Sequence, residues 1–181
     1  MSAVDEIFAV YLDKGSNAYG GERVNQLEHA LQTAMLAEQS GADAALIVAS
    51  LLHDYGHLIH DLGEGVARRG IDDRHEISGA RKLSAFFGGA VTMPIKLHVE
   101  AKRYLCATDP EYMKLLSPAS SRSLSLQGGP FAPTEADSFA KHPFADCAAR
   151  LRRWDESAKQ IGLKTPSLEH FRAYAEACLI R

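Results

Sequence analysis

Four of the eight histidines fall in predicted helices with a carboxylate close by in the sequence, which makes them candidate metal ligands. They are His29, His53, His75 and His98. Imidazole and carboxylate together suit iron, manganese and similar metals, whereas a structural zinc site usually recruits thiolates. For any one of these histidines, the alternative is a side chain satisfied by hydrogen bonds in the core or at the surface. The occurrence of four such histidines together favours a metal site over that alternative.

Burial supports this interpretation. His53 and Asp54 end the most apolar predicted helix, and His98 interrupts an apolar face that includes Ile95 and Val99. An ionisable side chain is costly to bury unless something pairs with it, and a metal ion can do so. Adjacent side chains on a helix diverge by about 100°, so His53 and Asp54 both reach one cluster only beside a helix end. The aspartate can then bridge two metals while the histidine binds one.

Helical periodicity dominates the elements that must position these residues, and it predicts an all-α protein. The expected helices cover residues 2–11, 27–36, 44–52, 74–87, 94–106, 143–160 and 166–179. Pro94 is expected to begin its helix, because proline is tolerated in the first turn. Residues 60–73 and 117–135 are predicted to be loops, and Leu124 and Leu126 indicate that the second loop packs down.

Length and composition fit one globular domain that spans residues 1–181. A formal net charge of -3 provides no basic field for nucleic acid or an anionic membrane. The longest apolar stretches are too short to span a bilayer, and the N-terminus lacks a signal pattern. We therefore expect a cytoplasmic protein with a small-molecule partner, without nucleic acid, membrane or an obligate protein partner. The three cysteines show no pairing pattern and are expected to serve packing.

The order of the candidate ligands along the chain resembles that of the HD-domain superfamily. In that superfamily a His, a His-Asp pair and a final Asp hold one metal, and two extra histidines recruit a second. The segments KRYLCATDPEYMKLLSPASSRSLSLQGGP (102–130) and LRRWDE (151–156) are similar to its mixed-valence diiron oxygenases. Within that branch the PhnZ-like 1-hydroxyphosphonate oxygenases, including the TmpB type, are closer than the longer myo-inositol oxygenases. The resemblance covers most of the chain and implies an HD-domain helical bundle with a dinuclear metal site in its core.

The resemblance also implies the metal ligands and the reaction. The implied ligands are His29, His53, Asp54 and Asp155 for one iron, and His75 and His98 for the second, with Asp54 bridging. Such enzymes hold a mixed-valence Fe(II)/Fe(III) pair and use O2 as a co-substrate. They cleave the C–P bond of an organophosphonate and release phosphate and a carboxylic acid.

Six further residues match substrate-binding positions of that family, and the first three of them match catalytic positions as well. They are Tyr19, Glu22, His57, Lys102, Ser120 and Arg152. Lys102 follows the ligand His98 by four residues on the same predicted helix face, so its ammonium can reach a phosphonate at the metal. The tyrosine is implied to cap the first iron until substrate displaces it. The glutamate is implied to face a cationic nitrogen of the substrate, and His57 to hydrogen-bond the substrate or a bridging oxygen.

Two glycines between Tyr19 and Glu22 predict a hinged lid over the metals. Gly20 would leave room for a bulky substituent, which favours (R)-1-hydroxy-2-(trimethylammonio)ethylphosphonate as the substrate, with glycine betaine and phosphate as products. The primary amine, which would give glycine, is the less favoured substrate.

Two other functions stay open at this point. One is a metal-dependent HD phosphohydrolase that acts on a nucleotide or a small phosphate ester. The other is a non-catalytic nucleotide-binding HD module, against which the intact set of ligand positions argues.

Overall fold

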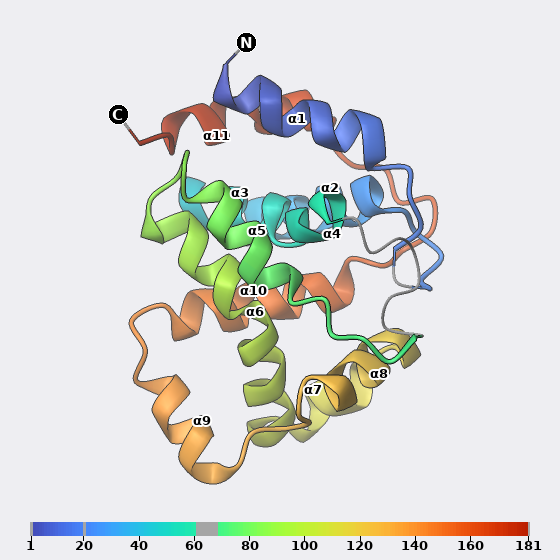
Figure 1. Cartoon of the computed structure of the whole chain (residues 1–181), viewed down its shortest axis with the longest axis vertical. Helices are drawn as coiled ribbons and strands as arrows, with labels where there is room; N and C mark the ends of the chain where they lie inside the picture. The colour runs from blue at the N-terminus through green and yellow to red at the C-terminus, as the bar shows by residue number, and fades with distance from the viewer. Residues whose placement is uncertain (1, 20, 61–68, 181) are drawn as a thin grey trace.

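The regular secondary structure is helical in the part of the chain that the computed structural model describes, residues 2–19, 21–60 and 69–180 (Figure 1). No β-strand occurs in these ranges, as the periodicity predicts. In chain order the helices are α1 (Ala3–Lys14), α2 (Gln26–Gln39), α3 (Ala44–Leu52), α4 (Tyr55–Ile59), α5 (His75–Leu83), α6 (Gly89–Thr108), α7 (Pro110–Leu115), α8 (Pro118–Leu126), α9 (Pro133–Ala140), α10 (Ala145–Ser157), the 3-10 helix η2 (Leu168–Phe171) and α11 (Arg172–Ala177). None of the described helices combines the length and the apolar character needed to cross a membrane.

Polar caps fix where the helices that carry the candidate ligands begin. At the start of α2, the Asn25 side chain accepts a hydrogen bond from the backbone N of Glu28 at 2.8 Å. The Glu28 carboxylate in turn accepts one from the backbone N of Asn25 at 2.8 Å. The Asp43 side chain caps α3 in a similar way. These caps satisfy N–H groups that have no partner inside the helix, so the position of His29 on α2 is well defined.

The core is built around α3 and α6. Residues 46–52 of α3 are all buried, as expected for the most apolar predicted helix. Helix α2 packs along α3, while α3, α5 and α10 pack against α6. Figure 1 shows α1 and α11 together at the end of the molecule where the termini lie, and α7, α8 and α9 at the opposite end. The helices that carry the candidate ligands therefore meet in the middle.

The prediction of a loop over residues 117–135 is wrong, because α8 and the start of α9 occupy much of it. Ser117 caps α8 by accepting a hydrogen bond from the backbone N of Ser120 at 3.1 Å, and Pro118 occupies the first turn. Serine favours caps and turns as readily as helices, so the composition concealed the helix. Leu124 is buried, as expected, whereas Leu126 is exposed. The short helix α7 was not predicted either.

Helix α6 begins at Gly89, five residues before Pro94, so the predicted start at the proline is wrong. A proline inside a helix removes one intrahelical hydrogen bond. Val91, Ile95 and His98 follow helical spacing and are all buried, and their packing explains why the helix continues through the proline. The last predicted helix, over 166–179, is divided into η2 and α11.

The three cysteines are free, as the lack of a pairing pattern predicts. Cys106 is buried in a small cluster with Leu105, Tyr112 and Leu124. Cys147 and Cys178 are half-buried against the main core. Their surroundings agree with a packing role.

Candidate metal centre and substrate cavity

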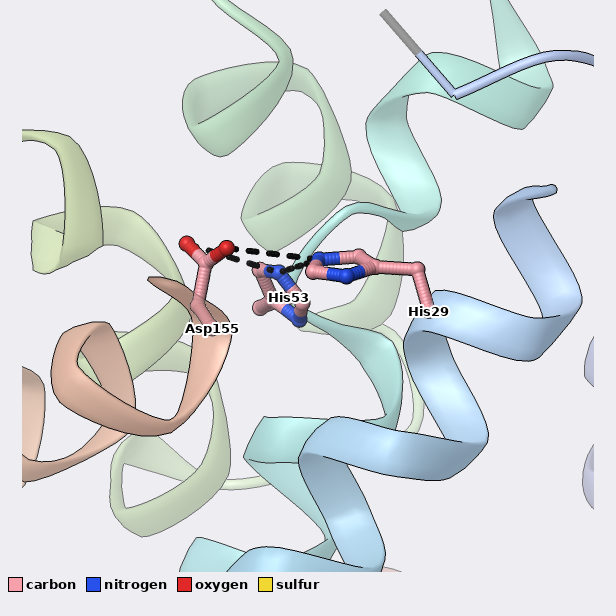
Figure 2. A group of neighbouring side chains, drawn as sticks. All are labelled: His29, His53 and Asp155. Atoms are coloured by element: carbon pink, nitrogen blue, oxygen red, sulfur yellow. Dashed lines mark hydrogen bonds and ion pairs between the residues drawn. The ribbon is translucent and has the colours of Figure 1, made fainter. Parts of the chain in front are cut away.

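Three buried side chains from different parts of the chain converge in the middle of the molecule (Figure 2). His29 comes from α2, His53 follows α3, and Asp155 comes from α10. Nε2 of His29 lies 3.1 Å from Nε2 of His53 and 3.3 Å from Oδ1 of Asp155. Each residue offers a ligand atom within 4.8 Å of the other two, a spacing that one metal ion can bridge. We call His29, His53 and Asp155 the first cluster.

A second cluster, formed by Asp54, His75 and His98, lies beside the first. Nε2 of His75 lies 3.1 Å from Nε2 of His98 and 3.3 Å from Oδ1 of Asp54. The other carboxylate oxygen, Oδ2 of Asp54, lies 3.2 Å from Nε2 of His53 in the first cluster. Asp54 therefore directs one oxygen at each cluster. The two adjacent His/Asp sites are suited to a pair of metal ions.

The second ring nitrogen of each clustered histidine already has a partner. The partners are the carbonyl oxygens of Ala158 for His29 (2.9 Å), Ser50 for His53 (2.9 Å) and Ile95 for His98 (2.7 Å), and Oδ1 of Asp73 for His75 (2.9 Å). Carbonyl and carboxylate oxygens accept the hydrogen bond here, so Nδ1 carries a proton, and Nε2 faces inward with a lone pair or, in a charged ring, with an N–H group. The inward-facing Nε2 atoms and carboxylates repel each other unless protons on the rings or metal ions lie between them. Metal-binding histidines are held in this way, and the donor set therefore fits a metal pair.

Electrostatics keep the carboxylates of the clusters ionised. Burial by itself raises the pKa of Asp54, but His53 and the other facing histidines outweigh it and hold the pKa well below its usual value. Burial also raises the pKa of Asp155, but Arg152, His53 and His29 together hold it well below its usual value. Burial lowers the pKa of His29, yet hydrogen bonds to both carboxylates raise it to about 9. Protons and metal ions therefore compete for the same nitrogen atoms.

Two glycines let α4 approach α5 closely enough to complete the second cluster. A Cβ atom at Gly56 would lie 2.0 Å from the carbonyl oxygen of His75. A Cβ atom at Gly79 would lie 2.9 Å from the backbone N of Gly56. Since no side chain fits between these backbones, α4 lies directly against the start of α5. Asp54, which immediately precedes α4, thereby comes within reach of His75.

His57 lies beside the second cluster, where its ring stacks on His75 with centroids 3.8 Å apart. Asp73 joins these two histidines, with Oδ2 2.7 Å from Nδ1 of His57 and Oδ1 2.9 Å from Nδ1 of His75. Burial and the neighbouring His75 lower the pKa of His57, which favours its neutral form. Sequence reasoning missed Asp73. The available signal was a carboxylate two residues before a candidate ligand.

Tyr19 lies against the first cluster, where the sequence analysis expected a cap. Its ring stacks on His29 with centroids 3.9 Å apart, and its hydroxyl lies 3.5 Å from Oδ1 of Asp155. The backbone N of Glu22 donates to the carbonyl oxygen of Tyr19 at 2.6 Å, so a turn connects the two expected guard residues. Gly20, on which the expected substrate preference rests, lies outside the described residues.

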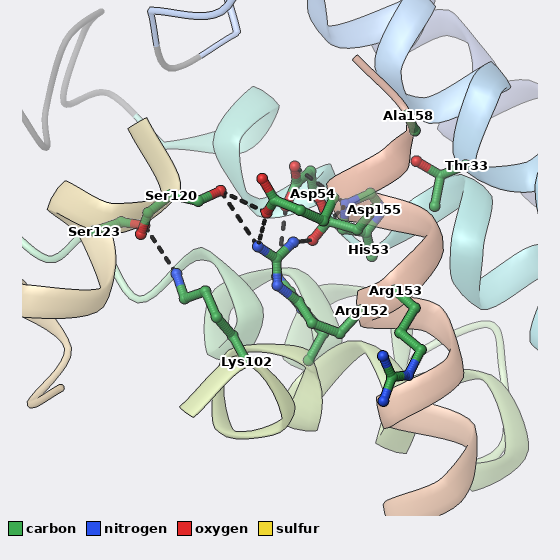
Figure 3. Close-up of polar contacts among 12 residues, drawn as sticks. Thr33, His53, Asp54, Lys102, Ser120, Ser123, Arg152, Arg153, Asp155 and Ala158 are labelled. Atoms are coloured by element: carbon green, nitrogen blue, oxygen red, sulfur yellow. Dashed lines mark hydrogen bonds and ion pairs between the residues drawn. The ribbon is translucent and has the colours of Figure 1, made fainter. Parts of the chain in front are cut away.

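A cavity of about 320 Å³ is lined by the second cluster and by residues of α8 and α10. Lys102, Ser120 and Arg152, the expected phosphonate contacts, line it as well (Figure 3). Nζ of Lys102 donates to Oγ of Ser123 at 2.8 Å, while Arg152 donates to Oγ of Ser120 at 3.3 Å and pairs with Asp155. Burial, together with the nearby Arg152, lowers the pKa of Lys102 to about 7. An anion that enters the cavity would favour the protonated form again.

Lys159 lines the same cavity and was missed by sequence reasoning. Its Nζ lies 2.9 Å from Oγ of Ser120, 3.0 Å from Oε1 of Glu156 and 3.3 Å from Oε1 of Glu22. Glu156 also pairs with Arg152. The available signal was the spacing of charges in LRRWDESAK, where residues three and four apart share a helix face. Glu22 thus meets a cation of the protein where the sequence analysis expected a cation of the substrate.

The chain is similar along nearly its whole length to proteins named as phosphonate dioxygenases. Hydroxymethylphosphonate dioxygenase of Gimesia maris is 46% identical over 177 residues, which cover 97% of this chain and 88% of that protein. 1-Hydroxy-2-(trimethylamino)ethylphosphonate dioxygenase (glycine-betaine-forming) of Leisingera caerulea is 42% identical over 168 residues, which cover 93% and 86%. An uncharacterized protein of Acanthamoeba polyphaga mimivirus is 33% identical over 171 residues, which cover 93% and 78%. No family model matches the chain.

Proposed function

Because the chain belongs to the phosphonate dioxygenases, enzymes that cleave a C–P bond, we propose that it oxidises a 1-hydroxyphosphonate with O2 at a pair of iron ions. The observation that carries this proposal is the carboxylate of Asp54, which directs one oxygen at each histidine cluster. Iron in a mixed-valence Fe(II)/Fe(III) state is the proposed metal, since a donor set of imidazole and carboxylate suits it. We also propose that residues 1–181 form one HD domain around this centre.

The proposed ligands follow the two clusters. They are His29, His53, Asp54 and Asp155 for one iron, and Asp54, His75 and His98 for the other. Support comes from the convergence of four Nε2 atoms, because the hydrogen bonds at Nδ1 leave each Nε2 available to a metal once its proton, where present, is released. When bound, the iron pair would supply activation of O2 and coordination of the substrate's oxygen atoms.

The chain's own residues would bind the phosphonate and control access. Lys102, Ser120 and Arg152 are the proposed phosphonate contacts, because their polar groups gather at one side of the cavity. His57 is held in orientation by a carboxylate, so its Nε2 can hydrogen-bond the substrate. Tyr19 is the proposed cap of the first iron. In the reaction C1 is oxidised to a carboxylate, O2 is reduced, the C–P bond breaks and phosphate leaves.

Two substituents on C1 are candidates for the substrate. The trimethylammonium group of (R)-1-hydroxy-2-(trimethylammonio)ethylphosphonate, expected from Gly20, is supported by the relative named for that compound. Hydroxymethylphosphonate carries only hydrogen on C1 besides the hydroxyl and the phosphonate. It is supported by the relative of 46% identity named for it. Both are 1-hydroxyphosphonates, so the proposed chemistry at C1 is the same.

The experiment that tests this function combines metal analysis with turnover. We expect the protein, purified with reductant, to contain two iron ions per chain and to show the electron paramagnetic resonance signal of a coupled Fe(II)/Fe(III) pair. It should release phosphate from a 1-hydroxyphosphonate in step with O2 consumption. His98→Gln should lose metal and activity, whereas His170→Gln, a change at an exposed histidine paired with Glu38, should retain both.

Other outcomes would favour the alternatives. Two magnesium or zinc ions, with hydrolysis of phosphate esters in the absence of O2, would replace the proposal by an HD phosphohydrolase. Tight nucleotide binding without turnover of either class of compound would replace it by a binding module.

A further inference from the structure

Glu22, the residue expected to meet a cation of the substrate, already has a cationic partner in the protein. Nζ of Lys159 lies 3.3 Å from Oε1 of Glu22, and the hydroxyl of Ser117 donates to the same oxygen at 2.5 Å. The side chains of Lys159 and Glu22 are only 11% and 16% exposed, so solvent and salt screen their attraction weakly. Bonds to Ser120 and Glu156 hold the ammonium in place.

The charged side chains around Glu22 balance one another without a cation from the substrate. Two carboxylates, Glu22 and Glu156, contact two cations, Arg152 and Lys159. Asp155, which also pairs with Arg152, is a proposed iron ligand. Within this group no negative charge is left over for a cationic substituent. A cation that approaches Glu22 must displace Lys159 or lie beside it, and like charges in a partly buried site disfavour each other strongly.

We infer that Lys159 is a specificity-determining residue that selects against a cationic substituent on C1 of the substrate. The chain would accordingly favour 1-hydroxyphosphonates with an uncharged substituent, of which hydroxymethylphosphonate is the smallest. This inference rests on the proposed function and concerns the same cavity. It differs from the expectation drawn from Gly20, which concerned the room for a trimethylammonium group and not its charge.

Two substrates of the same shape separate charge from size. 1-Hydroxy-2-(trimethylammonio)ethylphosphonate and 1-hydroxy-3,3-dimethylbutylphosphonate differ only in a quaternary nitrogen against a quaternary carbon. We expect the wild-type protein to favour the uncharged compound in kcat/KM by at least about tenfold. Lys159→Met frees Glu22 and should shift this ratio toward the cation by at least about tenfold, mainly through KM. Lys159→Arg keeps the charge and should keep the preference.

The controls keep the outcome decisive. Lys114→Met removes a surface lysine paired with Glu111 and should leave the ratio unchanged. If Lys159→Met has no turnover, the ratio of dissociation constants for the same two compounds, measured by calorimetry without O2, takes the place of the kinetic ratio. A ratio that Lys159→Met does not change would overturn the inference. Failure of the iron-loaded wild-type protein to cleave these two compounds and hydroxymethylphosphonate would instead refute the proposed function, and the binding ratio would still test Lys159.

Discussion

Gly56→Ala tests whether the close approach of α4 and α5 assembles the second cluster. The added Cβ would lie 2.0 Å from the carbonyl oxygen of His75, 2.7 Å from its carbonyl carbon and 2.8 Å from its Cα. These are backbone atoms, so no side-chain rotation can relieve the overlap. Because real Cβ atoms essentially never show contacts under 3.0 Å, the two backbones must separate by at least about 1 Å, the difference between 3.0 and 2.0 Å.

The expected magnitude follows from this overlap. Overpacking of a core contact destabilises a protein by about 1–3 kcal/mol. In a chain of this size each kcal/mol lowers the melting temperature by about 2–4 °C, so we expect the metal-depleted variant to melt roughly 2–12 °C below wild type. The same displacement moves Asp54 away from His75. At present Oδ1 of Asp54 lies 3.3 Å from Nε2 of His75. Metal affinity should therefore fall at the second cluster more than at the first.

Circular dichroism during thermal unfolding and calorimetric metal titration without O2 measure the two effects. Gly89→Ala is the matched control, because its Cβ would meet Cγ of Met93 at 3.7 Å, an ordinary contact, and alanine favours the helix. The control should be as stable as wild type or slightly more so. A Gly56→Ala protein that binds two metal ions with wild-type affinity would refute the role of this contact in building the second cluster.

Three further predictions concern the metal centre. Asp73→Asn should weaken metal binding at the second cluster by roughly 10–100-fold, because it replaces the carboxylate that orients His75 with a neutral amide. Asp72→Asn, a change at an exposed neighbour, is the control for the metal titration. Burial lowers the pKa of His29 and of His75, but their carboxylate partners raise these values to about 9 and about 10. Both rings are thus protonated at pH 8, and metal loading at that pH should release about two protons, which an indicator dye in weak buffer detects. Metal affinity should decrease as the pH falls, and loading at pH 8 without proton release would contradict these assignments. Tyr19→Phe should accelerate substrate-free O2 consumption and iron oxidation, since it loses the hydroxyl beside the first cluster; unchanged rates in an oxygen electrode would rule out capping.

The sequence by itself determined the all-α class and the identity of the six candidate ligands. The class and five of the ligands follow from local rules, whereas Asp155 is implied by the resemblance of LRRWDE to the diiron oxygenases. A period of 3.6 residues predicts a helix without reference to the rest of the chain. A buried His or Asp on an apolar helix implies a partner, and the same period places Lys102 on the face of His98. The structure then brings all six ligand candidates into two adjacent clusters, because those faces turn toward one core.

The tertiary structure alone placed Asp73 beside the second cluster and Lys159 in the cavity. Asp73 reaches His75 and His57 only because α4 lies against α5, and that contact depends on Gly56, which the sequence offers merely as a weak helix former. Lys159 meets Glu22 across 137 positions of chain, 159 minus 22, and no periodicity predicts a pairing over such a separation. The helix α8 belongs here too, since serine permits either a cap or a helix. Where local preferences are balanced or absent, burial and pairing between distant segments decide the structure.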